Sequence, residues 1–232
     1  MMRKKVKQVG AYFLVMLCLI CISVPAEAAV SSSQKKTADS VDSFIGAVII
    51  ETYANMNGTG NHNATKKQFL KSLKKTYNGK LTTKVMSAIA ASQTKGYKWS
   101  YNSYITPGEV GKVSASKVKK EYKNLFGKKI SKINLPVRKS SKSLKGWYLD
   151  FAKNKSSSTV YWYSGYETDT NLTGKITGIK KAGSGKYTIT KKYSFYKHWS
   201  HKKPDYTFTV KIKVKKNSKS SYQYNIIGLS IQ

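Results

Sequence analysis

Side chains that bind metals or carry out acid–base catalysis are scarce in this chain, and only three histidines are present. His198 and His201 lie three residues apart, and Asp205 follows four residues later. Two imidazoles and a carboxylate at this spacing could bind zinc if their segment folded back on itself. Three flanking lysines, however, would repel a dication. We therefore interpret the segment as a solvated turn between two strands, and we expect neither a metal nor another cofactor.

Acidic residues form the second candidate group. The chain has ten Asp and Glu, whereas a glycosidase or a metal-dependent nuclease needs at least two that converge. Glu167 and Asp169 are two residues apart, so they would share one face of a strand, and Asp150 lies on or beside a neighbouring predicted strand. Pairing with nearby lysines is the simpler role. A hydrolase for an anionic or glycan substrate, using these groups or the segment from His198 to Asp205, is the alternative function.

Lysines form the most regular pattern of charged residues. Lys211, Lys213 and Lys215 alternate with apolar residues, so on a strand they would stand in line on one face, about 6.6–6.8 Å apart. Lys216 and Lys219 would extend this line at the following turn. Such a cationic ridge could follow an anionic polymer. Equally, lysines on an edge strand prevent edge-to-edge aggregation, and the pattern alone does not decide between the two.

The overall charge limits the possible partners. The chain carries 43 Lys and Arg against ten Asp and Glu, a formal net charge of +33. After residue 28 nearly all of this charge is lysine, because Arg138 is the only arginine there. Arginine is the residue that reads guanine edges, so we expect no sequence-specific nucleic-acid binding. The charge predicts salt-dependent association with an anionic cell-wall polymer or a membrane surface. A protein-interaction domain is a further alternative.

Aromatic residues alternate along several segments. In the run Tyr161-Trp162-Tyr163, strand geometry places Trp162 on the opposite face from the two tyrosines. One face must be core, and the other would be covered by a helix or present a flat ring to solvent, as sugar-binding proteins do. Aromatic residues are also good strand formers, which is the simpler explanation.

The first 28 residues have the pattern of a secretory signal peptide. Four basic residues precede an apolar run from Ala11 to Val24, and Ala26-Glu27-Ala28 matches a cleavage site after Ala28. The run is shorter than the ~20 residues of a membrane-spanning helix. Cleavage would remove both cysteines, so we expect no disulfide-linked partner and a secreted, extracellular or cell-wall-associated protein. The mature chain would retain a formal charge of +30, from 39 basic and nine acidic residues.

The remaining sequence separates into a helical part and a strand-rich part. Residues 29–38 resemble a polar spacer, and 39–232 are predicted to form a single α+β domain, with a possible subdomain break near 134–146. Apolar residues at intervals of three and four predict helices over 39–53, 65–77, 81–93 and 116–126. Residues 97–105 are rich in aromatic residues and β-like. Alternating apolar and polar residues further along the chain predict strands at 147–152, 159–163, 174–181, 187–196, 207–215 and 222–231. We expect a curved antiparallel meander with helices packed on one face, similar in outline to cystatin-like or NTF2-like folds.

Two segments resemble uncharacterised secreted proteins of Clostridia-like Gram-positive bacteria. Residues 113–130 (VSASKVKKEYKNLFGKKI) are similar to a helix that ends in Phe-Gly in those proteins, and residues 210–231 (VKIKVKKNSKSSYQYNIIGLSI) to their closing hairpin. The resemblance implies a secreted helix-plus-sheet domain and assigns no functional residue.

Overall fold

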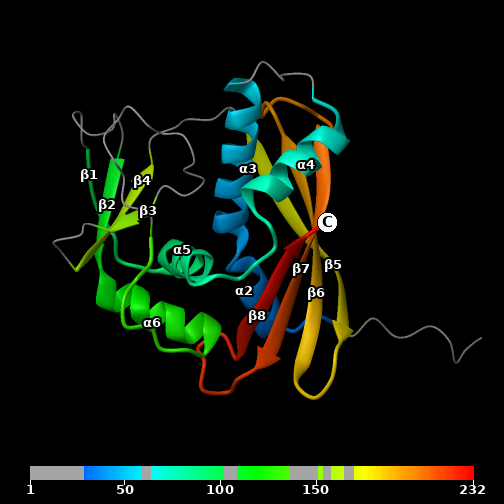
Figure 1. Ribbon diagram of the computed structural model, residues 1–232. Coiled ribbons are helices and arrows are strands. Elements are labelled where there is room, and N and C mark those ends of the chain that lie inside the picture. The colour runs from blue at the N-terminus through cyan, green and yellow to red at the C-terminus, as the bar shows by residue number, and fades with distance from the viewer. Residues whose placement is uncertain (1–28, 59–63, 102–108, 136–150, 154–157, 165–169) are drawn as a thin grey trace, which may run out of the picture.

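The computed structural model describes residues 29–58, 64–101, 109–135, 151–153, 158–164 and 170–232. Five helices and two four-stranded antiparallel sheets occupy this part of the chain (Figure 1). The predicted α+β class is therefore confirmed. The predicted signal peptide, residues 1–28, lies outside the described residues.

The larger sheet is the predicted meander. Its strands are β5 (Asn171–Lys181), β6 (Lys186–Tyr196), β7 (Tyr206–Lys216) and β8 (Tyr224–Ile231), and they pair in chain order. Apolar and polar residues alternate along its strands. In β7 every second residue from Tyr206 to Val214 is buried, and the residues between them are not. One face of the sheet is therefore core, and the other is polar.

Helices α2 (Ser32–Asp39), α3 (Asp42–Gly58) and α4 (Lys66–Thr76) lie on the apolar face (Figure 1). Five residues of the predicted apolar stripe are fully buried: Val41, directly before α3, and Phe44, Ile45, Val48 and Ile49 within it. The sixth, Tyr53, is partly buried. The prediction of a polar spacer over 29–38 is wrong, because α2 occupies most of it. Ser31 and Gln34 form a capping box, and Thr37 and Ala38 are buried. Most of these residues are polar by type, but Gln34, Thr37 and Ala38 are buried.

The predicted helices α4, α5 (Thr83–Gln93) and α6 (Ala115–Phe126) are confirmed, with ends set by their caps. Thr65 caps α4 in a second capping box, and Thr82 caps α5. Gly127 ends α6 in the left-handed conformation at a φ of 66°, which glycine adopts without strain.

A second sheet corrects the expectation of one continuous meander. It contains β1 (Lys98–Tyr101), β2 (Glu109–Ser114), β3 (Phe151–Lys153) and β4 (Thr159–Ser164), in the order β1-β2-β4-β3. The central strand β2 was not predicted, because its sequence EVGKVS is short and interrupted by glycine. The predicted strand 159–163 corresponds to β4, which pairs with β2 and β3 and not with the meander. Of the predicted strand 147–152, residues 147–150 lie outside the described residues.

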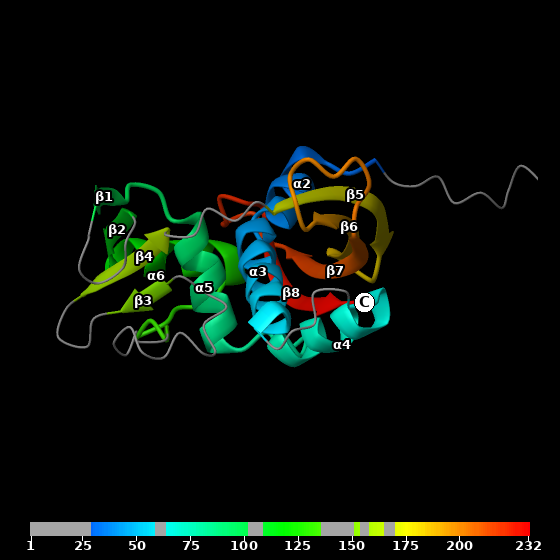
Figure 2. The same ribbon diagram turned by 90° about the horizontal axis from the view of Figure 1, so that it is seen from above.

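Helices α5 and α6 connect the two sheets. The two helices pack on each other, and α6 also contacts β8 of the larger sheet and β2 and β4 of the smaller one. Viewed from above, α5 and α6 lie on the side of α3 that faces the smaller sheet (Figure 2). One cluster of buried side chains includes residues of both sheets.

Candidate polyanion-binding surface

The predicted lysine ridge lies on an interior strand. β7 pairs with β6 on one side and with β8 on the other. The explanation that these lysines protect a sheet edge is therefore wrong. Lys211, Lys213 and Lys215 do share the polar face, as predicted, whereas Lys216 falls on the opposite side of the strand by alternation. Lys219 is exposed in the turn between β7 and β8.

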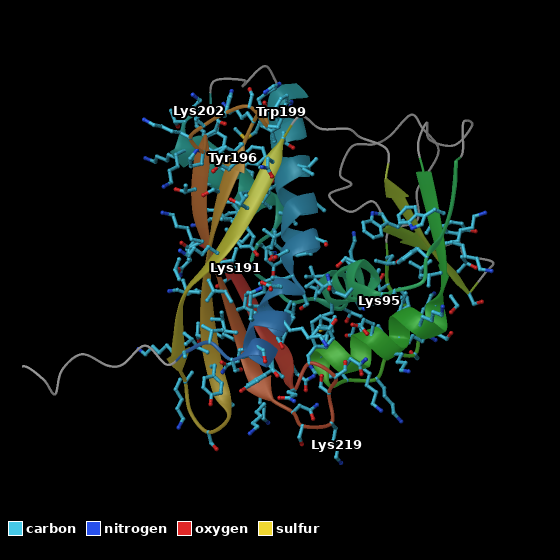
Figure 3. The ribbon with its side chains drawn as sticks, turned by 180° about the vertical axis from the view of Figure 1, so that it is seen from behind. Lys95, Lys191, Tyr196, Trp199, Lys202 and Lys219 are labelled. Atoms are coloured by element: carbon cyan, nitrogen blue, oxygen red, sulfur yellow. The ribbon has the colours of Figure 1, made fainter. Side chains whose placement is uncertain are left out.

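The polar face of the larger sheet, which we call the outer face, gathers lysines from three strands. By alternation and register they are Lys175 and Lys180 of β5, Lys186 and Lys192 of β6, and Lys211, Lys213 and Lys215 of β7. Thr188, Thr190, Thr207 and Thr209 lie between them. The four strands contain no Asp or Glu. Side chains tipped with nitrogen project from β6 and β7 on the side turned away from α3 (Figure 3).

Two pairs of lysines on the outer face are direct cross-strand neighbours. Lys175 is opposite Lys192 on β5 and β6, and Lys186 is opposite Lys215 on β6 and β7. Like charges in directly opposite positions destabilise a sheet. Threonines alternate with these lysines, so uncharged residues also fit this face. The charge of the lysines concentrates positive potential on the outer face.

Lys191 is the one buried lysine of the inner face among the described residues, and its charge is compensated. Its side chain is 2% exposed, and Nζ lies 2.6 Å from Oδ1 of Asp39 and 2.8 and 2.7 Å from the two carboxylate oxygens of Asp42. Three acceptors match the three N–H donors of an ammonium group. Tyr193 donates a further hydrogen bond of 2.6 Å to Asp42. These contacts fix the α2–α3 junction on β6.

The ionic contacts change the titration of the groups around Lys191. Burial by itself would raise the pKa of the Asp39 carboxyl, but hydrogen bonds from Lys191 and Lys35 outweigh burial and hold that pKa below its usual value. Burial raises the pKa of the Tyr193 hydroxyl, and the neighbouring Asp42 carboxylate raises it further. Asp39 therefore stays ionised, as compensation of the buried ammonium requires.

Gly174 on β5 leaves room for this buried network. A Cβ atom at this position would lie 2.8 Å from Cε of Lys191 and 2.8 Å from Cε1 of Tyr193. Both distances are far inside van der Waals contact, so a larger residue would displace the two side chains.

The other carboxylates with described side chains are also engaged away from the outer face. Glu121 of α6 accepts a hydrogen bond from Tyr222, and Asp205 accepts from the backbone N–H of Lys197. Together with Asp39 and Asp42, they bond to groups of α2, the inner face, α6, the β6–β7 loop or the β7–β8 turn. Among the described side chains, acidic residues therefore do not neutralise the outer face.

The histidine segment forms a structured loop between β6 and β7. His201 Nδ1 lies 2.8 Å from Asp205 Oδ2, as the sequence spacing allowed, while the His198 ring contacts the hydroxyl of Ser200. Burial alone would raise the pKa of Asp205, but hydrogen bonds from Lys197 and His201 lower it. The described residues contain no group of three or more His, Cys, Asp or Glu side chains that could hold a metal ion. Glu167, Asp169 and Asp150 lie outside the described residues.

Aromatic residues gather on one face of the smaller sheet. Trp99 and Trp162 lie on either side of Gly111, with ring centroids 5.4 Å apart, and Tyr97 contacts both rings. Gly111 leaves room for these rings, because a Cβ atom would lie 3.0 Å from both Trp99 and Tyr97. Trp99 remains 44% exposed.

Sequence reasoning missed two parts of this arrangement. Lys175, Lys186 and Lys192 were not recognised as neighbours of the β7 lysines, because that requires the pairing of separate strands. Lys191 was not recognised as a core residue, although it occupies the apolar phase of β6 between Ile189 and Tyr193. The alternation of β6 could therefore have predicted that Lys191 is buried.

None of the helices in the described part of the chain combines the length and apolar character needed to span a membrane. No protein family, curated protein or solved structure matches the chain. The similarity in outline to cystatin-like or NTF2-like folds, and the resemblance to secreted clostridial proteins, therefore stay predictions.

Proposed function

We propose that this protein is a secreted, non-catalytic polycation that associates with anionic polymers of the cell envelope through the outer face of the β5–β8 sheet. The observation that supports this most directly is the composition of that face. Seven lysines stand on three adjacent strands that carry no carboxylate, and two pairs of them are direct neighbours despite their repulsion.

The geometry favours an extended, repeating anion over a compact one. Lysines on one strand face recur about every 6.6–6.8 Å, and neighbouring strands lie about 4.8 Å apart. This forms a broad, nearly continuous array, whereas a small anion would need groups that converge on one point. Lysine ammonium groups act as hydrated point charges, which suits a flexible polymer better than a bidentate contact.

Binding to a soluble polyanion across a salt series tests this proposal. We choose polyphosphate as a defined probe and purified teichoic acid as an envelope polymer. Each lysine contact releases counterions from the polymer. For a single-stranded polyanion it adds roughly 0.7 to the magnitude of the slope of log K against log salt concentration. Replacing Lys192, Lys211 and Lys213 by Gln should therefore reduce the slope of log K against log salt concentration by about 2.

A matched variant separates the outer face from total charge. Replacing the exposed lysines Lys71, Lys120 and Lys128 by Gln removes the same three charges from α4, α6 and the segment after α6. We expect this control to keep most of the affinity and slope. Equal losses in the two variants, or binding by the wild type that does not respond to salt, would contradict the proposal.

A hydrolase is the alternative, and the segment from His198 to Asp205 supplies its described candidate groups. Assay of polymer or glycan cleavage by the wild type and by Glu167→Gln, Asp169→Asn and His201→Ala variants tests it. Product formation that depends on these side chains would replace a binding role by a catalytic one.

A further inference from the structure

The loop that joins β6 and β7, residues 197–205, carries the most exposed of the large hydrophobic side chains in the described chain. Trp199 is 70% exposed, compared with 44% for Trp99. Its indole stacks on the ring of His198, with centroids 5.6 Å apart, and otherwise projects from the end of the molecule beside Lys202 (Figure 3). We call residues 197–205 the Trp199 loop.

Hydrogen bonds hold the Trp199 loop in one conformation. The Asp205 N–H donates to the carbonyl of Phe195 at 2.9 Å, and the Asp205 carboxylate accepts from the Lys197 N–H at 2.8 Å. The same carboxylate oxygen bonds to His201 Nδ1, and the His201 N–H donates to the carbonyl of His198 at 3.1 Å. The loop is therefore ordered before any partner binds, so little conformational entropy would be lost on binding.

Among the described side chains, those around the indole are mainly basic. Lys202 and Lys203 follow Trp199 and are exposed. Lys66, the first residue of α4, reaches the same end of the sheet, where its Nζ lies 3.2 Å from Oγ1 of Thr207. The one carboxylate of the loop, Asp205, faces inward, with 20% of its side chain exposed.

This combination is complementary to an anionic bilayer surface. Tryptophan favours the boundary between lipid headgroups and acyl chains, because its ring is apolar and its N–H is a donor. Lysines next to it are attracted by anionic headgroups. A soluble polyanion would attract the same lysines but would offer the indole no apolar region to enter.

From these observations we infer that the Trp199 loop docks the protein on a membrane of anionic phospholipid, with the Trp199 side chain inserted among the headgroups. The loop lies at the end of the molecule opposite Lys219 (Figure 3), and its role does not depend on polymer binding by the outer face. The two interactions would hold one protein between a membrane and the polymer around it.

Quenching by brominated lipids tests the insertion directly. We use the mature chain with vesicles of phosphatidylglycerol and brominated phosphatidylcholine, and follow tryptophan fluorescence. The wild type and a Trp99→Phe variant should be quenched on binding, whereas Trp199→Phe should lose most of this quenching. Quenching that persists in Trp199→Phe, or no binding of the wild type to anionic vesicles, overturns the inference.

Vesicle partitioning measures the contribution of each group. Removing the indole in Trp199→Ala should weaken partitioning roughly tenfold, as expected for partial burial of a large aromatic side chain. Lys202→Gln with Lys203→Gln should weaken it mainly at low salt. Unfolding midpoints equal to that of the wild type would show that the variants fold, since Trp199 is a surface residue.

The two proposals fail separately in these assays. Trp199→Ala should bind polyphosphate as the wild type does, and the Lys192, Lys211 and Lys213 triple variant should still show bromolipid quenching. Loss of polymer or glycan binding in Trp199→Ala with unchanged vesicle binding would show that the loop contacts a different partner, and would overturn the membrane assignment alone.

Discussion

The two faces of the β5–β8 sheet place lysine in opposite environments. On the inner face, Lys191 is 2% exposed and is matched by two aspartates within 2.8 Å. On the outer face, Lys175 stands opposite Lys192 with no carboxylate on any of the four strands. Lys191 and Lys192 are adjacent on β6, yet carboxylates compensate the charge of Lys191 and none on these strands compensates that of Lys192.

This difference separates charge that serves folding from charge that is available to a partner. A buried ammonium requires compensation, because desolvation of an unpaired charge costs several kcal/mol. An exposed ammonium remains hydrated and can be left without a partner. The carboxylates with described side chains therefore lie where folding needs them, and none of them compensates the lysines of the outer face.

The largest expected effect comes from removing the compensation of Lys191. Asp39→Asn with Asp42→Asn should lower the free energy of unfolding by about 3 kcal/mol, because a buried charge would be left unmatched. Urea denaturation measures it. Adding Lys191→Met to this background should recover much of the loss, since no buried charge then remains. A double variant as stable as the wild type would show that the inner network does not support the fold.

An intermediate effect is expected at Gly174. Gly174→Ala would place Cβ 2.8 Å from Lys191 and Tyr193 and should destabilise by about 1–3 kcal/mol, the usual cost of overpacking. Gly46→Ala is the matched control on α3, where the new Cβ would lie 3.8 Å from Leu172. That control should stabilise by up to about 1 kcal/mol, because alanine favours helix. Thermal unfolding of both variants checks the opposite signs.

The smallest change in stability is expected from replacing one lysine of the outer face by an acidic residue. Lys175→Glu would place opposite charges at a directly paired position with Lys192, and should stabilise the sheet by about 0.2–1 kcal/mol. The same change should weaken binding to polyphosphate at low salt. Measuring stability and affinity on one sample tests the comparison: a gain in stability without a loss of affinity would show that the outer face does not bind the polymer.

Much of the secondary structure followed from local sequence. Apolar residues at intervals of three and four were sufficient to place α3, α4 and α6. Alternation placed all four strands of the meander. The errors arose where local chemistry gave a misleading signal: α2 is polar by residue type, and β2 is short and contains Gly111.

The candidate surface was predictable only in part. Alternation correctly placed Lys211, Lys213 and Lys215 on one polar face. It could not show that β7 is interior, nor that Lys175 and Lys192 are neighbours, because strand order and register depend on contacts between separate segments. It also could not bring Asp39 and Asp42 to Lys191, which lies 152 and 149 residues further along the chain.

The sequence by itself determined the α+β class, the excess of lysine and the alternation that divides each strand into an apolar and a polar side, because these depend on residue type and on spacing of a few residues. Tertiary structure decided which lysines share a surface and which one is buried with two aspartates. The physical reason is that charge compensation and cross-strand repulsion act between side chains within a few ångströms, and chain folding alone sets those distances.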